Sequence, residues 1–242
     1  ALYISDLWKQ AGLPDGIWNV VNGDKDSVNE LLENPAVHAI SFVGSTPVAK
    51  YIYETGAKYG KRVTALGGGK NHMVVMPDAD LEQVANSFIG AAYGAASQRC
   101  MAISTIMPVG DETADKLVAI LKEKITALKV GSYENAESDF GPVISEGATV
   151  VTDGRQEELV ASNGFFVGPT LLDNITKDMD IYEQEVFGPV RNVVRVASLE
   201  EAIESINALE LANGVTIFTN DGLAARKFTT EIDVGMVGVN VP

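Results

Sequence analysis

The chain has 242 residues, of which 46% are hydrophobic and 23 are glycine, and its formal net charge at pH 7 is −15. Such a size and composition are typical of an ordinary globular protein with one large core or two smaller ones. The negative charge, without any dense block of lysine or arginine, opposes binding to nucleic acid or to anionic lipid.

The predicted elements of the first 70 residues alternate between helix and strand. They are helix 2–12, strand 17–21, helix 28–33, strand 37–43, helix 47–59 and strand 62–66. Alternation of this kind predicts parallel strands joined by crossover helices, as in dinucleotide-binding folds.

A second α/β unit is predicted beyond residue 70. Asp78 can cap a helix over 79–95, whose apolar residues follow helical spacing and whose last turns are rich in glycine and alanine. A strand over 103–109 and an amphipathic helix over 112–128 follow.

No membrane-spanning segment or secretion signal is expected. No run approaches the roughly 18 apolar residues of a membrane span, and the first residues lack a basic start with an apolar core. The lone cysteine, Cys100, excludes an internal disulfide and fits a reducing compartment, so we expect a cytoplasmic protein. His38 and His72 lack ligand spacing, so no metal site is expected.

Cys100 lies in the segment Ser97-Gln98-Arg99-Cys100-Met101. By residue type alone, a free cysteine is more often a small buried hydrophobe than a nucleophile. Three other segments favour a nucleophile: Phe42-Val43-Gly44-Ser45-Thr46, Leu66-Gly67-Gly68-Gly69-Lys70-Asn71-His72 and Glu183-Gln184-Glu185-Val186-Phe187-Gly188-Pro189-Val190.

Together and in this order, the four segments resemble the NAD(P)-dependent aldehyde dehydrogenase superfamily, and the resemblance runs from end to end. Gly69-Lys70-Asn71-His72, Val75-Met76-Pro77-Asp78-Ala79 and Gln98-Arg99-Cys100-Met101-Ala102 are similar to the CoA-acylating methylmalonate-semialdehyde (malonate-semialdehyde) dehydrogenases.

The resemblance implies a fold of two α/β parts. Residues 1–70 would form the C-terminal half of a Rossmann-type cofactor domain, and residues 71–242 a catalytic domain that is incomplete at its C-terminus. Between the matching stretches at 140–144 and 165–170, the chain is shorter than its relatives, which carry an additional helix there. The missing N-terminal half would supply an oxyanion-hole asparagine and a ribose-binding lysine. We therefore expect a partial family sequence, and a homo-oligomer because family members form dimers or tetramers.

The same resemblance implies roles for individual residues. Cys100 would be the nucleophile that forms a thioester. Ser45 would face the cofactor phosphates, the backbone of Gly67 would lie near the nicotinamide, and Phe187 would pack beside that ring. Glu185 would hold the ribose hydroxyls, since a carboxylate can accept two hydrogen bonds. NAD is the expected cofactor and CoA the expected co-substrate.

Leu66 and Arg99 narrow the expected chemistry. Leu66 stands where hydrolytic relatives carry a glutamate, and leucine cannot take a proton from water, so transfer of the acyl group to CoA is favoured. The guanidinium of Arg99 suits the carboxylate of a semialdehyde, although a surface ion pair would also explain it.

The expected function is NAD-dependent oxidation of methylmalonate or malonate semialdehyde to an acyl-CoA, with loss of the β-carboxylate as CO2. Two alternatives stay open. One is a hydrolytic aldehyde dehydrogenase, and the other is an inactive fragment or a binding protein on the same scaffold.

Overall fold

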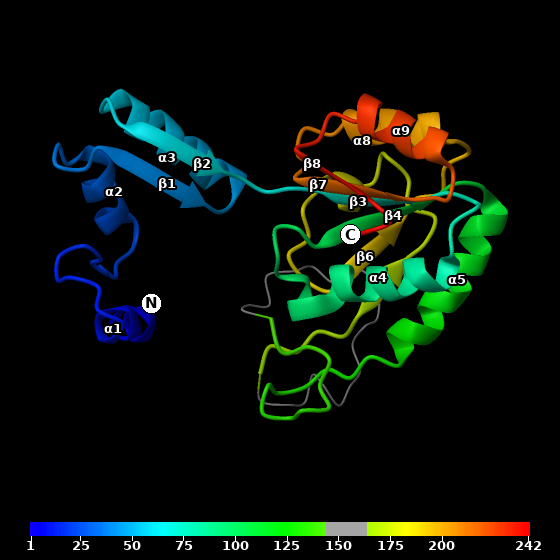
Figure 1. The fold of residues 1–242 in the computed structure, drawn as a ribbon, viewed down its shortest axis with the longest axis horizontal. Coiled ribbons are helices and arrows are strands. Elements are labelled where there is room, and N and C mark those ends of the chain that lie inside the picture. The colour runs from blue at the N-terminus through cyan, green and yellow to red at the C-terminus, as the bar shows by residue number, and fades with distance from the viewer. Residues whose placement is uncertain (144–163) are drawn as a thin grey trace. The chain divides into compact units, whose positions relative to one another are not determined.

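The computed structural model describes residues 1–143 and 164–242. The stretch predicted to be shorter than in relatives lies outside the described residues. The chain divides into two compact units, Ala1–Gly67 and Gly68–Pro242, each built from helices and parallel strands (Figure 1). The predicted α/β class is confirmed.

The first unit contains a two-stranded parallel sheet with helices around it. Its elements are α1 (Leu2–Gln10), α2 (Lys25–Glu33), β1 (Ala39–Val43), α3 (Thr46–Lys58) and β2 (Arg62–Leu66). A Cβ atom at Gly56 of α3 would lie 2.6 Å from Cγ2 of Val63 in β2. Glycine therefore lets this helix approach the sheet closely.

The strand predicted over residues 17–21 is wrong, because these residues form no strand in the structure. Ile17 is 69% exposed, and the ring of Trp18 lies against that of Trp8 with centroids 4.6 Å apart. The apolar pattern of this segment therefore reflects packing of the Trp18 ring against Trp8, and not pairing in the sheet of β1 and β2.

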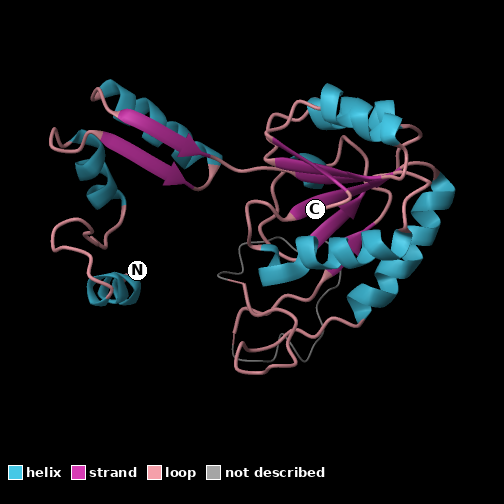
Figure 2. Ribbon diagram, in the orientation of Figure 1, coloured by secondary structure: helices cyan, strands magenta, loops and turns pink. Residues whose placement is uncertain are grey.

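The second unit is a six-stranded parallel sheet with helices on both faces (Figure 2). The strand order is β5-β6-β4-β3-β7-β8. The strands are β3 (Asn71–Val75), β4 (Ile103–Pro108), β5 (Thr170–Leu172), β6 (Val190–Val193), β7 (Gly214–Phe218) and β8 (Met236–Val239). The helices are α4 (Leu81–Tyr93), the 3-10 turn η1 (Gly94–Ser97), α5 (Asp111–Thr126), α7 (Asp180–Glu183), α8 (Leu199–Asn207) and α9 (Gly222–Glu231).

Each face of this sheet carries its own hydrophobic core. Val84 and Phe88 of α4 and Leu117 of α5 are fully buried in the cluster on one face. Ile203 of α8 and Phe228 of α9 belong to the cluster on the other face. The central strands of a parallel sheet covered on both sides in this way are buried along their length, as β3 and β4 are.

The parallel topology brings distant segments together at one end of the strands. All strands of a parallel sheet begin at the same end, so the segments that precede β3, β4, β6 and β7 lie there. These segments are residues 68–70, 97–102, 184–189 and 211–213. The N-terminal ends of these strands therefore carry Arg99, Cys100, Glu185 and Phe187 of the predicted site.

Candidate active site

Ser45 and Gly67 lie next to each other in the first unit, just after the carboxyl ends of β1 and β2. The amide of Gly44 donates to the carbonyl of Leu66 at 3.1 Å. A Cβ at Gly67 would lie 2.9 Å from Oγ1 and 3.2 Å from Cα of Thr46. Ser45 is the N-cap of α3, yet its hydroxyl makes no capping hydrogen bond and is exposed.

Cys100, the predicted nucleophile, follows a left-handed turn at the end of α4. The helix ends at Tyr93, two residues before the predicted end, because Ala95, Ala96 and Ser97 have φ of 54°, 51° and 61°. Each of these left-handed conformations costs a non-glycine residue about 1–2 kcal/mol. The Ser97 hydroxyl donates to the carbonyl of Ala92, which closes the turn back onto the helix.

Asn71 anchors the backbone at Cys100, whose thiol is exposed. The Asn71 Nδ2 atom donates to the carbonyls of Cys100 at 2.8 Å and Ala102 at 3.0 Å. Its Oδ1 atom accepts from the amides of Asn213 at 3.2 Å and Gly214 at 2.9 Å. One buried amide thus satisfies four backbone groups and joins the nucleophile segment to β7. Its place in the sequence predicts no such role for Asn71.

Arg99 caps the last turn of α4 and forms no ion pair within the described part of the chain. Its Nη2 atom donates to the carbonyls of Gly90 at 2.7 Å and Ala91 at 3.0 Å. A cation at the C-terminus of a helix is favourable because unpaired carbonyls carry negative partial charge there. Its Nε and Nη1 atoms make no hydrogen bond to a described residue, and the side chain is exposed.

Glu185 and Phe187 are exposed on the loop between α7 and β6. The end of the loop is held by the backbone, since the Val190 amide donates to Gly188 and the Thr170 amide donates to Pro189, both at 2.8 Å. The Nε atom of buried Arg191 donates to the carbonyl of Ala92 at 2.9 Å, so this loop lies beside the end of α4 that carries the nucleophile turn.

A row of buried polar side chains crosses the sheet behind the site. His72 pairs in register with Thr105, and Thr105 with Asn192. Burial lowers the pKa of His72 to about 3, so its imidazole is neutral, and its Nδ1 atom lies 2.9 Å from the Lys70 carbonyl. Within residues 1–143 and 164–242, no group of three or more His, Cys, Asp or Glu residues could hold a metal ion.

No helix in the described part of the chain is long and apolar enough to cross a bilayer.

The model of the aldehyde dehydrogenase family matches residues 1–242. The chain belongs to the aldehyde dehydrogenase family. Its resemblance to this family is thereby confirmed along the whole sequence.

Relatives that are about half identical to this aldehyde dehydrogenase chain are named for oxidation of malonate semialdehyde. The chain is 52% identical over 258 residues to malonate-semialdehyde dehydrogenase of Pseudomonas aeruginosa, covering 100% of the chain and 52% of the relative. It is 49% identical to malonate-semialdehyde dehydrogenase 2 of Geobacillus kaustophilus, covering 98% of the chain and 52% of the relative. The chain therefore spans about half the length of these relatives.

Solved structures show the same family fold. A putative methylmalonate-semialdehyde dehydrogenase from Sinorhizobium meliloti, complexed with NAD, matches with a TM-score of 0.95 at 49% identity over 100% of the chain and 52% of its own length. Methylmalonate-semialdehyde dehydrogenase from Oceanimonas doudoroffii matches with a TM-score of 0.94 at 50% identity, over 100% and 53%. The predicted aldehyde dehydrogenase fold is confirmed.

Proposed function

We propose that the protein oxidises malonate or methylmalonate semialdehyde with NAD and transfers the resulting acyl group to CoA. The observation that carries the proposal is the exposed thiol of Cys100, held on a fixed turn in a chain about 50% identical to malonate-semialdehyde dehydrogenases. The cytoplasmic location and the homo-oligomer stay predictions.

Each unit, taken by itself, carries residues that fit a part of a dinucleotide. The backbone at Gly67 packs against Thr46 too closely for a side chain, which leaves a smooth surface at the carboxyl ends of β1 and β2. Ser45, at the start of α3, would contact the phosphates, because a helix N-terminus favours negative charge. Glu185 would accept hydrogen bonds from ribose hydroxyls, and Phe187, which is 48% exposed, would lie against the nicotinamide. The bound cofactor would accept a hydride from the substrate.

Cys100 is the nucleophile in this proposal. Its thiolate attacks the aldehyde carbon, forming a C–S bond and leaving the negative charge on the former carbonyl oxygen. After the hydride has left, the substrate is held on Cys100 as a thioester. Asn71 holds the Cys100 carbonyl, so the backbone that carries the thiol keeps its position through both steps.

The release of the thioester is inferred from Leu66, which stands where hydrolytic relatives carry a glutamate. Its side chain, 56% exposed at the end of β2, cannot act as a general base toward water. The thiol of CoA therefore attacks the thioester carbonyl, and Cys100 leaves as thiolate. Before this transfer the β-carboxylate leaves as CO2, and the carbon that carried it takes a proton from solvent. Arg99 would donate to that carboxylate from Nη1 while Nη2 stays on the helix carbonyls.

The test is NADH formation from malonate semialdehyde with and without CoA, for the wild type, Cys100→Ser and Leu66→Glu. The wild type is expected to turn over only with CoA, Cys100→Ser to be inactive, and Leu66→Glu to gain CoA-independent turnover. Steady release of carboxylic acid by the wild type without CoA would show a hydrolytic enzyme instead. No NADH under any condition would favour an inactive scaffold.

A further inference from the structure

The loop that carries Glu185 and Phe187 rests on a buried lysine. The Nζ atom of Lys70 donates to the carbonyls of Ile181 and Gln184, each at 2.7 Å, and the residue is only 1% exposed. The Nδ2 atom of Asn192 shares the Ile181 carbonyl at 2.9 Å. The backbone just before Glu185 is therefore held by the side chains of Lys70 and Asn192.

A second buried cation binds the backbone on the C-terminal side of Glu185. The Nη1 atom of Arg191 donates to the carbonyl of Val190 at 3.0 Å and, over a longer 3.5 Å, to that of Val186. Its Nε atom donates to the carbonyl of Ala92 of α4, and its buried Nη2 atom has no hydrogen-bond partner among the described residues. Arg191 thus ties the loop to the helix end that precedes the nucleophile turn.

Neither cation is neutralised by a carboxylate at ion-pair distance within the described residues. Burial and the charge of Arg191 lower the pKa of Lys70 to about 8, while Glu185 opposes that shift. Burial also lowers the pKa of Arg191 to about 10. A buried cation without a counter-ion is unfavourable, and here the hydrogen bonds that both cations donate within the described residues all go to backbone carbonyls. Because of this cost, the hydrogen bonds of Lys70 and Arg191 add little to the free energy of unfolding, and their main effect is to fix the position of the backbone carbonyls.

We infer that Lys70 and Arg191 are positioning residues for Glu185. They hold the carbonyls of Gln184 and Val186, the two peptide neighbours of Glu185, and so present its carboxylate from a fixed backbone. The inference rests on the proposed function in one respect, because it takes the ribose of NAD as the partner of Glu185. Lys70 has the two shorter contacts to the loop, so its replacement has the larger effect.

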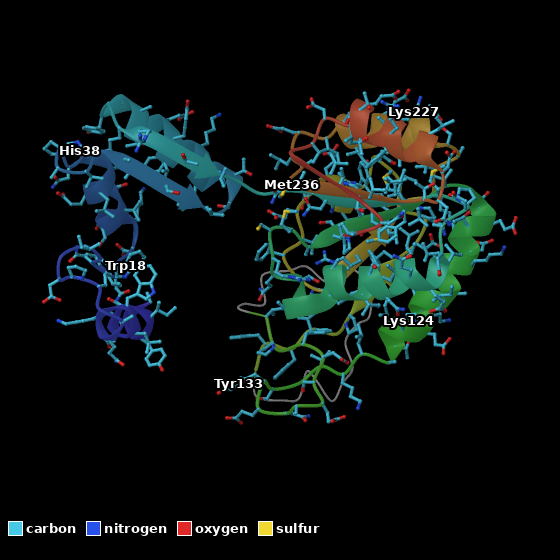
Figure 3. The ribbon with its side chains drawn as sticks, in the orientation of Figure 1. Trp18, His38, Lys124, Tyr133, Lys227 and Met236 are labelled. Atoms are coloured by element: carbon cyan, nitrogen blue, oxygen red, sulfur yellow. The ribbon has the colours of Figure 1, made fainter. Side chains whose placement is uncertain are left out.

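The test compares NAD binding by Lys70→Met and Arg191→Met with Lys227→Met, a control on α9 (Figure 3) that removes a surface lysine paired with Glu200 and Glu231. Loss of a hydrogen bond to a charged group costs about 10- to 100-fold in affinity, so Lys70→Met, which misplaces the Glu185 carboxylate, is expected to raise the Kd for NAD at least about tenfold. Unchanged NAD binding would overturn the inference.

A double-mutant cycle with Glu185→Ala separates positioning from general damage. If Lys70 acts through Glu185, then Lys70→Met causes no further loss of NAD binding in the Glu185→Ala background. Full additivity of the two losses would overturn the inference. Arg191→Lys, which keeps a cation, is expected to recover part of the binding lost in Arg191→Met.

A nucleotide-free readout distinguishes failure of the inference from failure of the proposed function. Amide hydrogen exchange in the peptide 181–190 is expected to be at least about tenfold faster in Lys70→Met than in the wild type and in Lys227→Met. If the wild type binds no NAD, the proposed function fails, and the rate of amide exchange in peptide 181–190 then tests by itself whether Lys70 positions the loop. Unchanged exchange would overturn it. Should Lys70→Met fail to fold, Arg191→Met and Arg191→Lys give the same comparison.

Discussion

The left-handed turn before Cys100 makes a specific prediction about Ser97. At φ of 61°, serine carries a strain of about 1–2 kcal/mol that glycine avoids, although glycine loses about 0.5–1 kcal/mol through its freer unfolded chain. The Ser97 hydroxyl also donates to the Ala92 carbonyl, which contributes about 1 kcal/mol. Ser97→Ala loses only the hydrogen bond and keeps the strain. Ser97→Gly loses the bond but relieves the strain.

We therefore expect Ser97→Ala to be about 1 kcal/mol less stable than the wild type, and Ser97→Gly to be close to it. Urea unfolding followed by circular dichroism measures both values. The matched control is Ser87 inside α4, where the right-handed helix reverses the order and alanine is more stable than glycine by about 1 kcal/mol. Alanine equal to or more stable than glycine at position 97 would refute the strained turn.

Four further predictions concern other residues of the site. The pKa of His72 is about 3 in the folded protein and 6.5 in the unfolded chain, so the free energy of unfolding falls as the pH falls from 6.5 toward 3. The loss is about 2 kcal/mol at pH 5, and urea unfolding of His72→Gln at a series of pH values should lack this pH dependence. The pKa of Lys70 is lowered from 10.5 to about 8 in the folded protein, so the unfolded chain binds more protons between these pH values. The free energy of unfolding therefore rises by roughly 3 kcal/mol between pH 8 and 10.5, and Lys70→Met should lack this rise. Asn71→Ala leaves four backbone groups unpaired and should cost about 3 kcal/mol or more in urea unfolding; a loss below about 1 kcal/mol would contradict its anchoring role. Arg99→Met should lower kcat/KM for malonate semialdehyde by about 10- to 100-fold and leave that for propanal, which lacks the carboxylate, nearly unchanged; equal losses would indicate helix capping alone.

Local periodicity predicts much of the fold. The stripe of Val84, Phe88 and Ala92 predicts α4, and those residues are buried in the core. The same reasoning extends the helix too far, because nothing in an Ala-Ala-Ser sequence indicates three left-handed residues. Strand β5, only three residues long at Thr170–Leu172, carries too little pattern to be predicted.

The site beyond its motifs depends on contacts between residues far apart in the chain. Lys70 and Gln184 are separated by 114 residues, and Ala92 and Arg191 by 99. Asn71 and Gly214 are separated by 143 residues. Sequence marks the Gly-Gly-Gly-Lys-Asn segment as unusual, yet the carbonyls that Lys70 and Asn71 bind become known only when the strands are placed side by side.

The most direct test of the proposed function is the chemical state of Cys100 after one turnover. The protein is mixed with NAD and malonate semialdehyde without CoA, and the peptide containing Cys100 is analysed by mass spectrometry. We predict an acetyl thioester on Cys100, formed with one equivalent of NADH and released as acetyl-CoA when CoA is added. An unmodified Cys100 after NADH has formed, or an adduct that water removes as fast as CoA does, would contradict CoA-acylating catalysis by this thiol.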